Sequence, residues 1–158
     1  METNIHYIKG DIFKQDVDIV GHQTNCLGIM GGGIAWVVRT KFPAVYQAYA
    51  ALCKHYKGHS SDMLGMCQIV PTGSGKIGYI ANLFGEDVPT GTQVDTDYDA
   101  LRTALTELHN RVKGKNFTVG LPYKLGCGLA GGDWNIVDGI IHDVFEGDET
   151  TNVLICEL

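Results

Sequence analysis

Short apolar runs alternate with segments of helical periodicity along the chain, and this alternation restricts the fold more than any other feature. The apolar runs predict strands over 5–8, 17–20, 63–70, 77–83, 117–121 and 152–156. Apolar residues at helical spacing predict helices over 34–42, 45–56, about 98–112 and 134–145. The order ββααββαβαβ predicts a mixed sheet with helices on its faces.

Local signals mark several boundaries between these elements. Pro43 marks the break between the first two helices, because proline cannot continue a helix from within. The turn composition PTGSGK at 71–76 predicts that the flanking strands form a hairpin. Thr96 or Asp97 is available as the N-cap of the third helix. The sequence contains no linker, internal repeat or low-complexity segment.

The length of the chain limits it to one sizeable core. It has 158 residues, of which 44% are hydrophobic, and we expect residues 1–158 to form one domain. No apolar run approaches the roughly 20 residues that a membrane span requires. Residues 1–9 lack the basic and apolar regions of a secretory signal. We therefore expect a cytoplasmic protein that does not bind membranes.

Cysteine, histidine and charge patterns argue against several other classes of protein. The five cysteines are widely spaced and include no CxxC pair, which indicates reduced thiols rather than a disulfide framework or a zinc site. The histidines show no metal-ligand spacing, so we expect neither a metal nor a cofactor. The net charge is −6 and no basic stripe is present, which argues against long nucleic acids as partners.

Two glycine clusters each follow a predicted strand and precede a predicted helix. The first glycine cluster is HQTNCLGIMGGGI at 22–34, and the second is GLPYKLGCGLAGGDW at 120–134. Unpaired N–H groups at a helix start attract anions, and glycine lets the backbone approach an oxyanion closely. One such run alone is equally compatible with a flexible turn. Together the two clusters predict a site for a ligand with two adjacent phosphates.

Two other motifs do not fit their usual context. Gly126, Gly128 and Gly131 spell GxGxxG, but they lie near the C-terminus and not in a first βαβ unit followed by an acidic residue about 20 positions on. This placement argues against a nicotinamide enzyme. GSGK at 73–76 lacks the first glycine of a P-loop and has Ile77 where a serine or threonine would bind magnesium. We interpret GSGK as the hairpin turn.

Four motifs, in this order, resemble those of the macrodomain family, which binds ADP-ribose. They are KGDIF at 9–13, HQTNC at the end of the second strand, GGGIA before the first helix and GCGLAGG after a late strand. The resemblance covers essentially the whole chain. It implies a three-layer α/β/α fold with a mixed central sheet. It also implies that the partner is ADP-ribose, an ADP-ribose derivative or an ADP-ribosylated protein.

The resemblance further implies which residues contact the ligand. Asp11, with Ile12 beside it, would accept a hydrogen bond from the adenine amino group. Asn25 would contact the distal ribose, and Phe84 would stack near that ribose unless it belongs to the core. The two glycine clusters would wrap the diphosphate and the distal ribose, chiefly through backbone N–H groups. Their contacting residues would be Gly31, Gly32, Gly33, Ile34, Gly126, Cys127, Gly128, Leu129 and Ala130.

His22 is the predicted catalytic residue. The chain is similar to the ADP-ribose 1''-phosphate phosphatase branch, also called Appr-1-p processing proteins, in which a histidine just before the asparagine is assigned a catalytic role. An imidazole with a pKa of about 6.5 can protonate a leaving oxygen or activate water near neutral pH. The alternative for His22 is a structural histidine buried at a strand end.

A second branch, the terminal ADP-ribose protein glycohydrolases, shares only part of its pattern with this chain. The GCGL sequence is common to both. The chain reads IANLFGE, without that branch's lysine after the fourth strand, and Ala130 stands where that branch has an aspartate. The resemblance therefore does not extend to the lysine-dependent mechanism of these glycohydrolases.

We predict that the protein hydrolyses a substituent on the distal ribose of ADP-ribose, with ADP-ribose 1''-phosphate as the first candidate substrate. A non-catalytic ADP-ribose reader is the alternative from another class. Deacetylation of O-acetyl-ADP-ribose, or release of ester-linked ADP-ribose from protein, is a further enzymatic alternative. Whether His22 faces the distal ribose or the core separates the enzyme from the reader.

Overall fold

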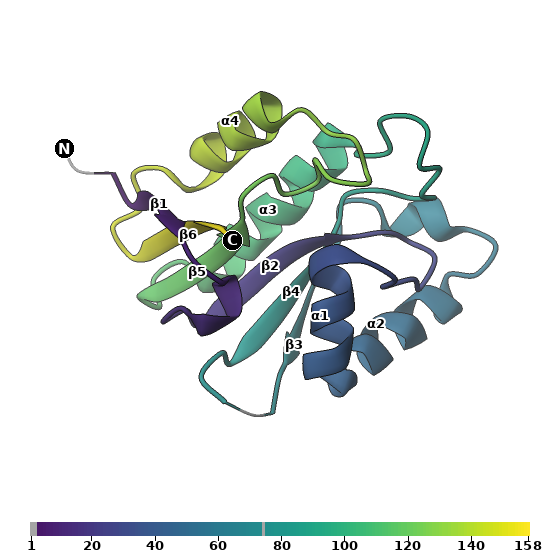
Figure 1. Ribbon diagram of the computed structural model, residues 1–158, viewed down its shortest axis with the longest axis horizontal. Coiled ribbons are helices and arrows are strands. Elements are labelled where there is room, and N and C mark those ends of the chain that lie inside the picture. Colours follow the sequence, from purple (N-terminus) through teal and green to yellow (C-terminus); the bar gives the residue numbers. More distant parts are fainter. Residues whose placement is uncertain (1–2, 74) are drawn as a thin grey trace.

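A six-stranded mixed sheet forms the middle layer of the structure, a computed structural model that describes residues 3–73 and 75–158 (Figure 1). The strands lie in the order β1-β6-β5-β2-β4-β3. β3 runs antiparallel to β4, and the other neighbouring pairs are parallel. The strands are β1 (Ile5–Lys9), β2 (Ile19–Thr24), β3 (Cys67–Pro71), β4 (Tyr79–Phe84), β5 (Phe117–Pro122) and β6 (Thr151–Glu157).

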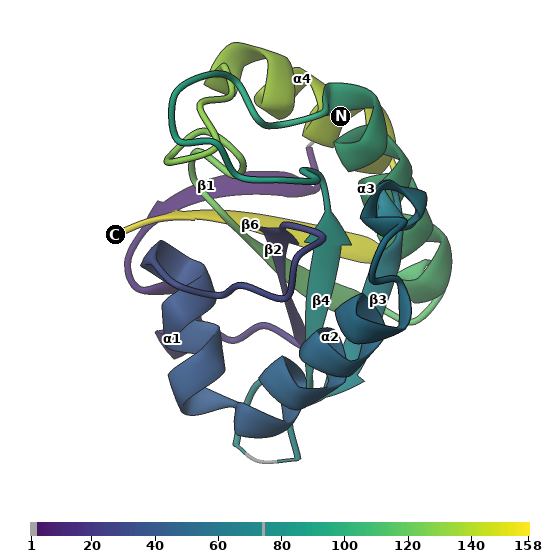
Figure 2. The same cartoon turned by 90° about the vertical axis from the view of Figure 1, so that its right-hand side faces the viewer.

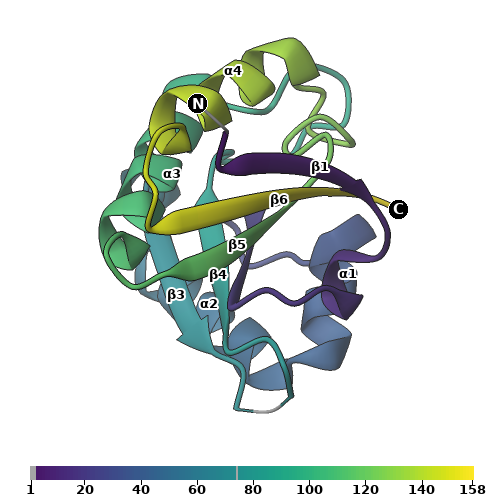
Figure 3. The ribbon, with the colours of Figure 1, turned by 90° about the vertical axis from the view of Figure 1, so that its left-hand side faces the viewer.

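Two pairs of helices cover opposite faces of this sheet (Figures 2 and 3). One face carries α1 (Gly33–Lys41) and α2 (Pro43–His55), and the other carries α3 (Tyr98–Val112) and α4 (Trp134–Phe145). Each face buries its own apolar cluster, because successive side chains of a strand point to opposite faces. The predicted three-layer α/β/α fold with a mixed sheet is confirmed.

The second strand extends further than its apolar residues predict. It was expected over 17–20, but β2 begins at Ile19 and continues through His22 to Thr24. The polar half of β2 pairs in parallel with the last three residues of β4. Pairing with β4 therefore extends β2 through His22 and Gln23, which are not part of the apolar run that predicts the strand.

The predicted hairpin is confirmed by the antiparallel pairing of β3 with β4. Its first strand begins at Cys67 instead of residue 63, because Ser60–Met63 form a short 3-10 helix that buries Met63. The predicted turn at 73–76 includes Ser74, which lies outside the described residues. A second 3-10 helix, Ile12–Lys14, follows β1.

The parallel strands β2, β4 and β5 end at the same edge of the sheet, and this edge positions the site. The segments that leave it are residues 25–32, 85–97 and 123–133. Ligands of open α/β sheets bind in the crevice outside the carboxyl ends of the strands. Among the residues that the structure describes, no helix is long and apolar enough to cross a membrane.

Candidate functional site

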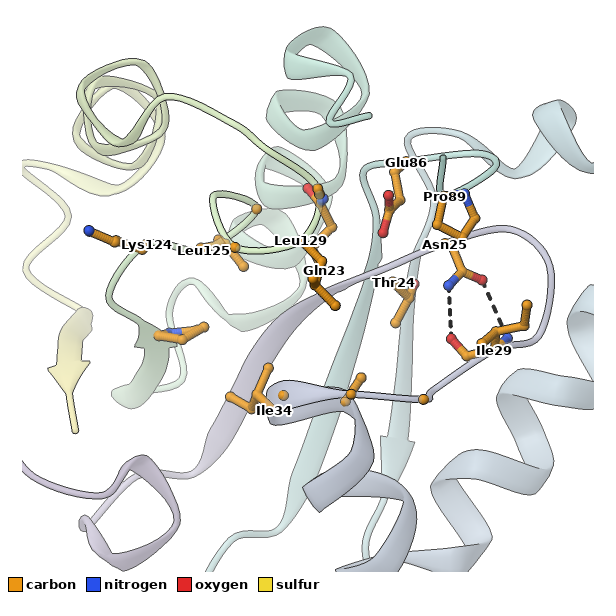
Figure 4. A pocket seen from close by; sticks show the side chains of 18 of the residues that line it. Gln23, Thr24, Asn25, Ile29, Ile34, Glu86, Pro89, Lys124, Leu125 and Leu129 are labelled. Carbon is orange, nitrogen blue, oxygen red and sulfur yellow. Dashed lines mark hydrogen bonds between the residues drawn. The ribbon is translucent and has the colours of Figure 1, made fainter. Parts of the chain in front are cut away.

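A cavity of about 780 Å³ lies at the carboxyl edge of the sheet, where the segments that follow β2, β4 and β5 meet (Figure 4). Small-molecule sites are typically of this size. Its lining residues are 23–25, 29, 31–35, 86, 89–91, 122–126 and 128–130. Both glycine clusters therefore contribute to one cavity.

The first glycine cluster leads directly into α1. Gly32 is the N-cap of α1, with an extended backbone (φ −156°) and no side chain that could accept a hydrogen bond from the first turn. Gly33 has φ 57°, a left-handed conformation that favours glycine. The start of α1 thus brings uncapped N–H groups to the cavity, an arrangement suited to an anionic group.

The second glycine cluster is packed so closely that some of its positions have no room for a side chain. A Cβ atom at Gly126 would lie 2.9 Å from Oε1 of Gln23, and one at Gly132 would lie 2.5 Å from the carbonyl oxygen of Gly126. By contrast, a Cβ atom at Gly128 would meet no atom within 4 Å. Gly126 and Gly132 therefore shape the loop, whereas Gly128 borders open space.

The two clusters approach each other at Leu129. A Cβ atom added at Gly32 would lie 3.7 Å from Cδ1 of Leu129. Leu129 is nevertheless 85% exposed. This exposed side chain therefore extends from the second cluster toward the first. A ligand held by both clusters would pass close to Leu129.

Asn25 lines the cavity, but its side-chain amide is engaged within its own loop. Oδ1 accepts hydrogen bonds from the N–H of Leu27 (3.0 Å), the N–H of Ile29 (3.4 Å) and the hydroxyl of Tyr49 (2.7 Å). Nδ2 donates to the carbonyl oxygen of Ile29 at 2.8 Å (Figure 4). The Asn25 amide therefore fixes the start of the first glycine cluster, and one of its N–H bonds remains for a ligand.

His22 does not line the cavity. It is fully buried on β2, and its Nε2 lies 2.7 Å from Oδ1 of Asn82, its partner on β4. Burial lowers the pKa of His22 to about 4, although the hydrogen bond to Asn82 acts in the opposite direction. The geometry therefore favours the structural alternative for His22, and its catalytic role stays a prediction.

Four predicted ligand residues lie outside the lining of the cavity. Phe84 is fully buried and packs on Tyr49, with ring centroids 5.8 Å apart. Ile12 is buried against β5. Asp11 caps the 3-10 helix after β1 and accepts a hydrogen bond from the N–H of Phe13 (2.9 Å). Cys127 is the fourth.

Asp11 nevertheless lies near the end of the cavity that β5 forms. Its charge acts on Cys156, whose pKa is raised to about 11, first by burial and then by Asp11. Cys156 pairs with Pro122, which lines the cavity. Asp11 is therefore one strand away from the cavity wall formed by the end of β5.

Sequence reasoning missed one wall of the cavity, the segment after β4. Glu86 and residues 89–91 belong to it. Asp95 holds this segment in shape by accepting hydrogen bonds from the N–H groups of Thr90 and Gly91. The N–H of Asp95 donates in turn to the carbonyl oxygen of Ala130 (2.7 Å), which ties the segment to the second glycine cluster. No glycine run marks this wall, so the sequence carries little signal for it.

Gln23 was also missed, because the resemblance implies no ligand contact for it although it belongs to the HQTNC motif. Its Nε2 donates to the hydroxyl of Thr96 (2.9 Å), and that hydroxyl donates to the carbonyl oxygen of Gly126 (2.6 Å). The Gln23 amide also occupies the space where a side chain at Gly85 would lie. Gln23 therefore links the ends of β2 and β4 to the second glycine cluster.

The two cysteines nearest the cavity are not activated. Burial raises the pKa of Cys26 to about 12 and that of Cys127 to about 11, so both are thiols near neutral pH. Cys127 donates to the carbonyl oxygen of Leu125 and does not line the cavity. Within residues 3–73 and 75–158, no group of three or more His, Cys, Asp or Glu side chains is placed to hold a metal ion.

The Macro domain family model matches residues 22–141 of the chain. The chain is 30% identical to the ADP-ribose 1''-phosphate phosphatase of the yeast Debaryomyces hansenii, over 87% of this chain and 92% of the yeast protein. It is 25% identical to the DNA ADP-ribosyl glycohydrolase of Mycobacterium tuberculosis, over 90% of this chain and 39% of that protein.

The fold is also similar to that of solved structures. Thermosipho africanus DarTG in complex with ADP-ribose superposes with a TM-score of 0.76 at 20% identity, over 97% of this chain and 42% of that chain. At this identity the similarity concerns the fold alone.

Proposed function

Because the chain belongs to the Macro domain family, we propose that it binds ADP-ribose in the cavity and hydrolyses a substituent on the distal ribose, with ADP-ribose 1''-phosphate as the substrate. The observation that carries this proposal is the convergence of two glycine clusters on one cavity of about 780 Å³. The similarity to the yeast phosphatase, over nearly the full length of both chains, supports the choice of substrate.

The two clusters would hold the diphosphate from opposite sides. The uncapped start of α1 supplies N–H groups and the positive end of the helix dipole. Gly128 and its neighbours supply open backbone on the other side. Binding through backbone groups explains how a chain with a net charge of −6 can hold a dianionic diphosphate.

We infer the orientation of the ligand from the roles that the macrodomain resemblance implies for Asp11 and Asn25. Adenine would lie toward the end of β5, beside Pro122 and near Asp11. The distal ribose would lie toward Asn25 and Glu86, at the ends of β2 and β4 (Figure 4). The substituent that is hydrolysed would therefore face Asn25 and Glu86.

The charge of the cavity favours a second candidate, an uncharged substituent such as an acetyl group or an ester link. Of the described lining residues, Lys124 is the one with a cationic side chain, and Figure 4 shows it on the opposite side of the cavity from Glu86. A phosphate at the distal ribose would thus face no lysine or arginine of the cavity wall. Deacetylation of O-acetyl-ADP-ribose needs no such cation.

Parallel turnover assays separate these candidates. The wild-type protein is incubated with ADP-ribose 1''-phosphate, O-acetyl-ADP-ribose and an ester-linked ADP-ribosylated protein, and ADP-ribose formation is followed by liquid chromatography. We expect the 1''-phosphate to be hydrolysed with the highest kcat/KM. Faster turnover of the acetyl or protein ester would select the second candidate. Binding of ADP-ribose without turnover of any substrate would show that the protein is a reader.

A further inference from the structure

Glu86 lies at the end of the cavity where the distal ribose is proposed to bind. Only Gly85 separates it from the end of β4, and its segment is held against the end of β2 by two hydrogen bonds. The N–H of Cys26 donates to the carbonyl oxygen of Asp87 (3.0 Å), and Sγ of Cys26 donates to that of Glu86 (3.3 Å). Figure 4 shows the Glu86 carboxyl group directed toward Thr24, beside Asn25.

The Glu86 carboxyl group differs from its acidic neighbours in lacking hydrogen-bond donors. Its Oε2 atom is buried and has no hydrogen-bond partner among the described residues. Asp87 accepts a hydrogen bond from the hydroxyl of Ser60 (2.7 Å). Asp95 accepts hydrogen bonds from the N–H and hydroxyl of Thr90 and from the N–H of Gly91. Asp87 and Asp95 are thus engaged in loop structure, whereas Glu86 is free to interact with a ligand.

The surroundings of Glu86 favour its protonated form. Burial raises the pKa of the carboxyl group above its ordinary value, and the nearby charge of Asp95 raises it further. Neither of two nearby side chains offers a positive charge that would stabilise the Glu86 carboxylate. The Cys26 thiol is neutral, and Asp87 is itself an acid. A bound phosphate would add negative charge next to the carboxyl group and raise its pKa again.

Few other groups could transfer a proton in this cavity. His22 is buried outside it, and the Cys26 and Cys127 thiols have raised pKa values. The other titratable residues of the lining, Tyr123 and Lys124, follow β5 directly, and Figure 4 shows Lys124 on the far side of the cavity from Glu86. Of the described residues that line the cavity, Glu86 is the one carboxylic acid.

We propose that Glu86 is the general acid of the hydrolysis, an inference that rests on the proposed function. Water attacks the phosphorus atom, the bond between phosphorus and O1'' breaks, and its electron pair passes to O1''. The Glu86 carboxyl group gives its proton to O1'', and the attacking water returns one proton to the carboxylate through solvent. The products are ADP-ribose and hydrogen phosphate. A proton delivered to O1'' prevents a charged alkoxide from forming on the sugar.

The test compares the wild type with Glu86→Gln, which keeps the shape of the side chain but cannot transfer a proton. Glu149→Gln is the matched control, because Glu149 is an exposed glutamate outside the cavity. Turnover of ADP-ribose 1''-phosphate is measured from pH 5 to 9, ADP-ribose affinity by calorimetry and folding by thermal melting. We expect Glu86→Gln to lose roughly 10² to 10⁴ in kcat. Its ADP-ribose affinity should stay within about threefold of the wild type, a small change on the affinity scale.

The pH profile distinguishes an acid from a structural residue. A general acid works in its protonated form, so the wild-type rate should fall as the pH rises through a pKa above the ordinary glutamate value of about 4.3. Glu86→Gln should lack this limb, and Glu149→Gln should keep it.

The outcomes separate this inference from the proposed function. Full turnover by a folded Glu86→Gln protein would overturn the role of Glu86 and leave the hydrolysis standing. Loss of kcat together with unfolding in Glu86→Gln would show a structural role for Glu86. Glu86→Asp would confirm that role if it restored folding but its rate did not fall as the pH rises. A wild type that binds ADP-ribose but hydrolyses no substrate would overturn the general acid and the hydrolysis together. A wild type that does not bind ADP-ribose would overturn the proposed function itself.

Discussion

The imidazole of His22 on β2 and the side-chain amide of Asn82 on β4 are joined by a buried hydrogen bond of 2.7 Å. Nδ2 of Asn82 donates to Oε1 of Gln68 (3.1 Å), so its Oδ1 must accept from Nε2–H of His22. Nε2 of Gln68 donates to the carbonyl oxygen of Ala48 in α2 (3.1 Å). This chain of polar groups connects β2, β4 and β3 to α2.

The first prediction concerns the effect of His22 on stability at low pH. The pKa of His22 is lowered to about 4 in the folded protein, whereas an unfolded histidine has a pKa of about 6.5. The unfolded state therefore binds the proton first, and stability is lost as the pH falls from about 6.5 to 4, by up to about 3 kcal/mol. His22→Asn should weaken this pH dependence in urea unfolding at pH 7 and 4.5. Equal pH dependence in both proteins would contradict the assignment.

The second prediction separates a structural from a catalytic His22. His22→Ala leaves Asn82 without its buried donor, which typically costs about 1 to 3 kcal/mol. We expect the melting temperature and the ADP-ribose affinity to fall together, with kcat for bound substrate almost unchanged. A stable variant that binds ADP-ribose normally but loses 10²-fold or more in kcat would restore His22 as a proton-transfer residue, since losses of roughly that size are typical of one.

The third prediction places the diphosphate between the glycine clusters. Gly32 has an extended backbone and Gly128 has free space around it, so Gly32→Glu and Gly128→Glu should fold. Each adds a negative charge where a phosphate is proposed to lie, so the Kd for ADP-ribose should rise at least about tenfold, roughly 1.4 kcal/mol. Gly139→Glu is the control, because Gly139 lies in α4 with no atom within 4 Å of an added Cβ. Unchanged affinity in both cavity variants would place the phosphates elsewhere.

The fourth prediction concerns the adenine end. Asp11→Ala should weaken ADP-ribose binding by about 1.5 to 3 kcal/mol, the usual loss for a hydrogen bond to a charged group. Its preference among substituents on the distal ribose should not change, because adenine lies at the other end of the ligand. Calorimetry with ADP-ribose, alongside melting curves that detect loss of the 3-10 helix cap, measures this effect. Wild-type affinity in Asp11→Ala would remove Asp11 from the site.

The order of elements and the glycine clusters could be predicted from sequence because both follow local rules. Apolar periodicity located the helices α1 to α4, and Asp97 accepts from the N–H of Ala100 as an N-cap should. Ten elements in the predicted order gave the three-layer fold. Gly31, Gly32, Gly33, Gly126 and Gly128 could be recognised because a backbone that approaches an anion closely favours glycine.

The positions of individual polar side chains could not be predicted in the same way. The resemblance implies a role at the ligand for both His22 and Phe84, but strand pairing and burial place their side chains in the core. Glu86 carries no motif, and it reaches the cavity only because the segment after β4 is tied to β2 and to Ala130. Such placement depends on contacts between segments far apart in sequence, which periodicity does not report.

The titration of the wild-type protein with ADP-ribose tests the central claim most directly. Calorimetry should show binding with one site per chain, and ADP-ribose should raise the melting temperature because it binds only the native state. AMP should bind more weakly, since it cannot reach both glycine clusters. At ADP-ribose concentrations of about 1 mM, binding with a Kd of about 1 mM or tighter, roughly −4 kcal/mol, would be detected, so absence of heat and of a thermal shift would contradict the account.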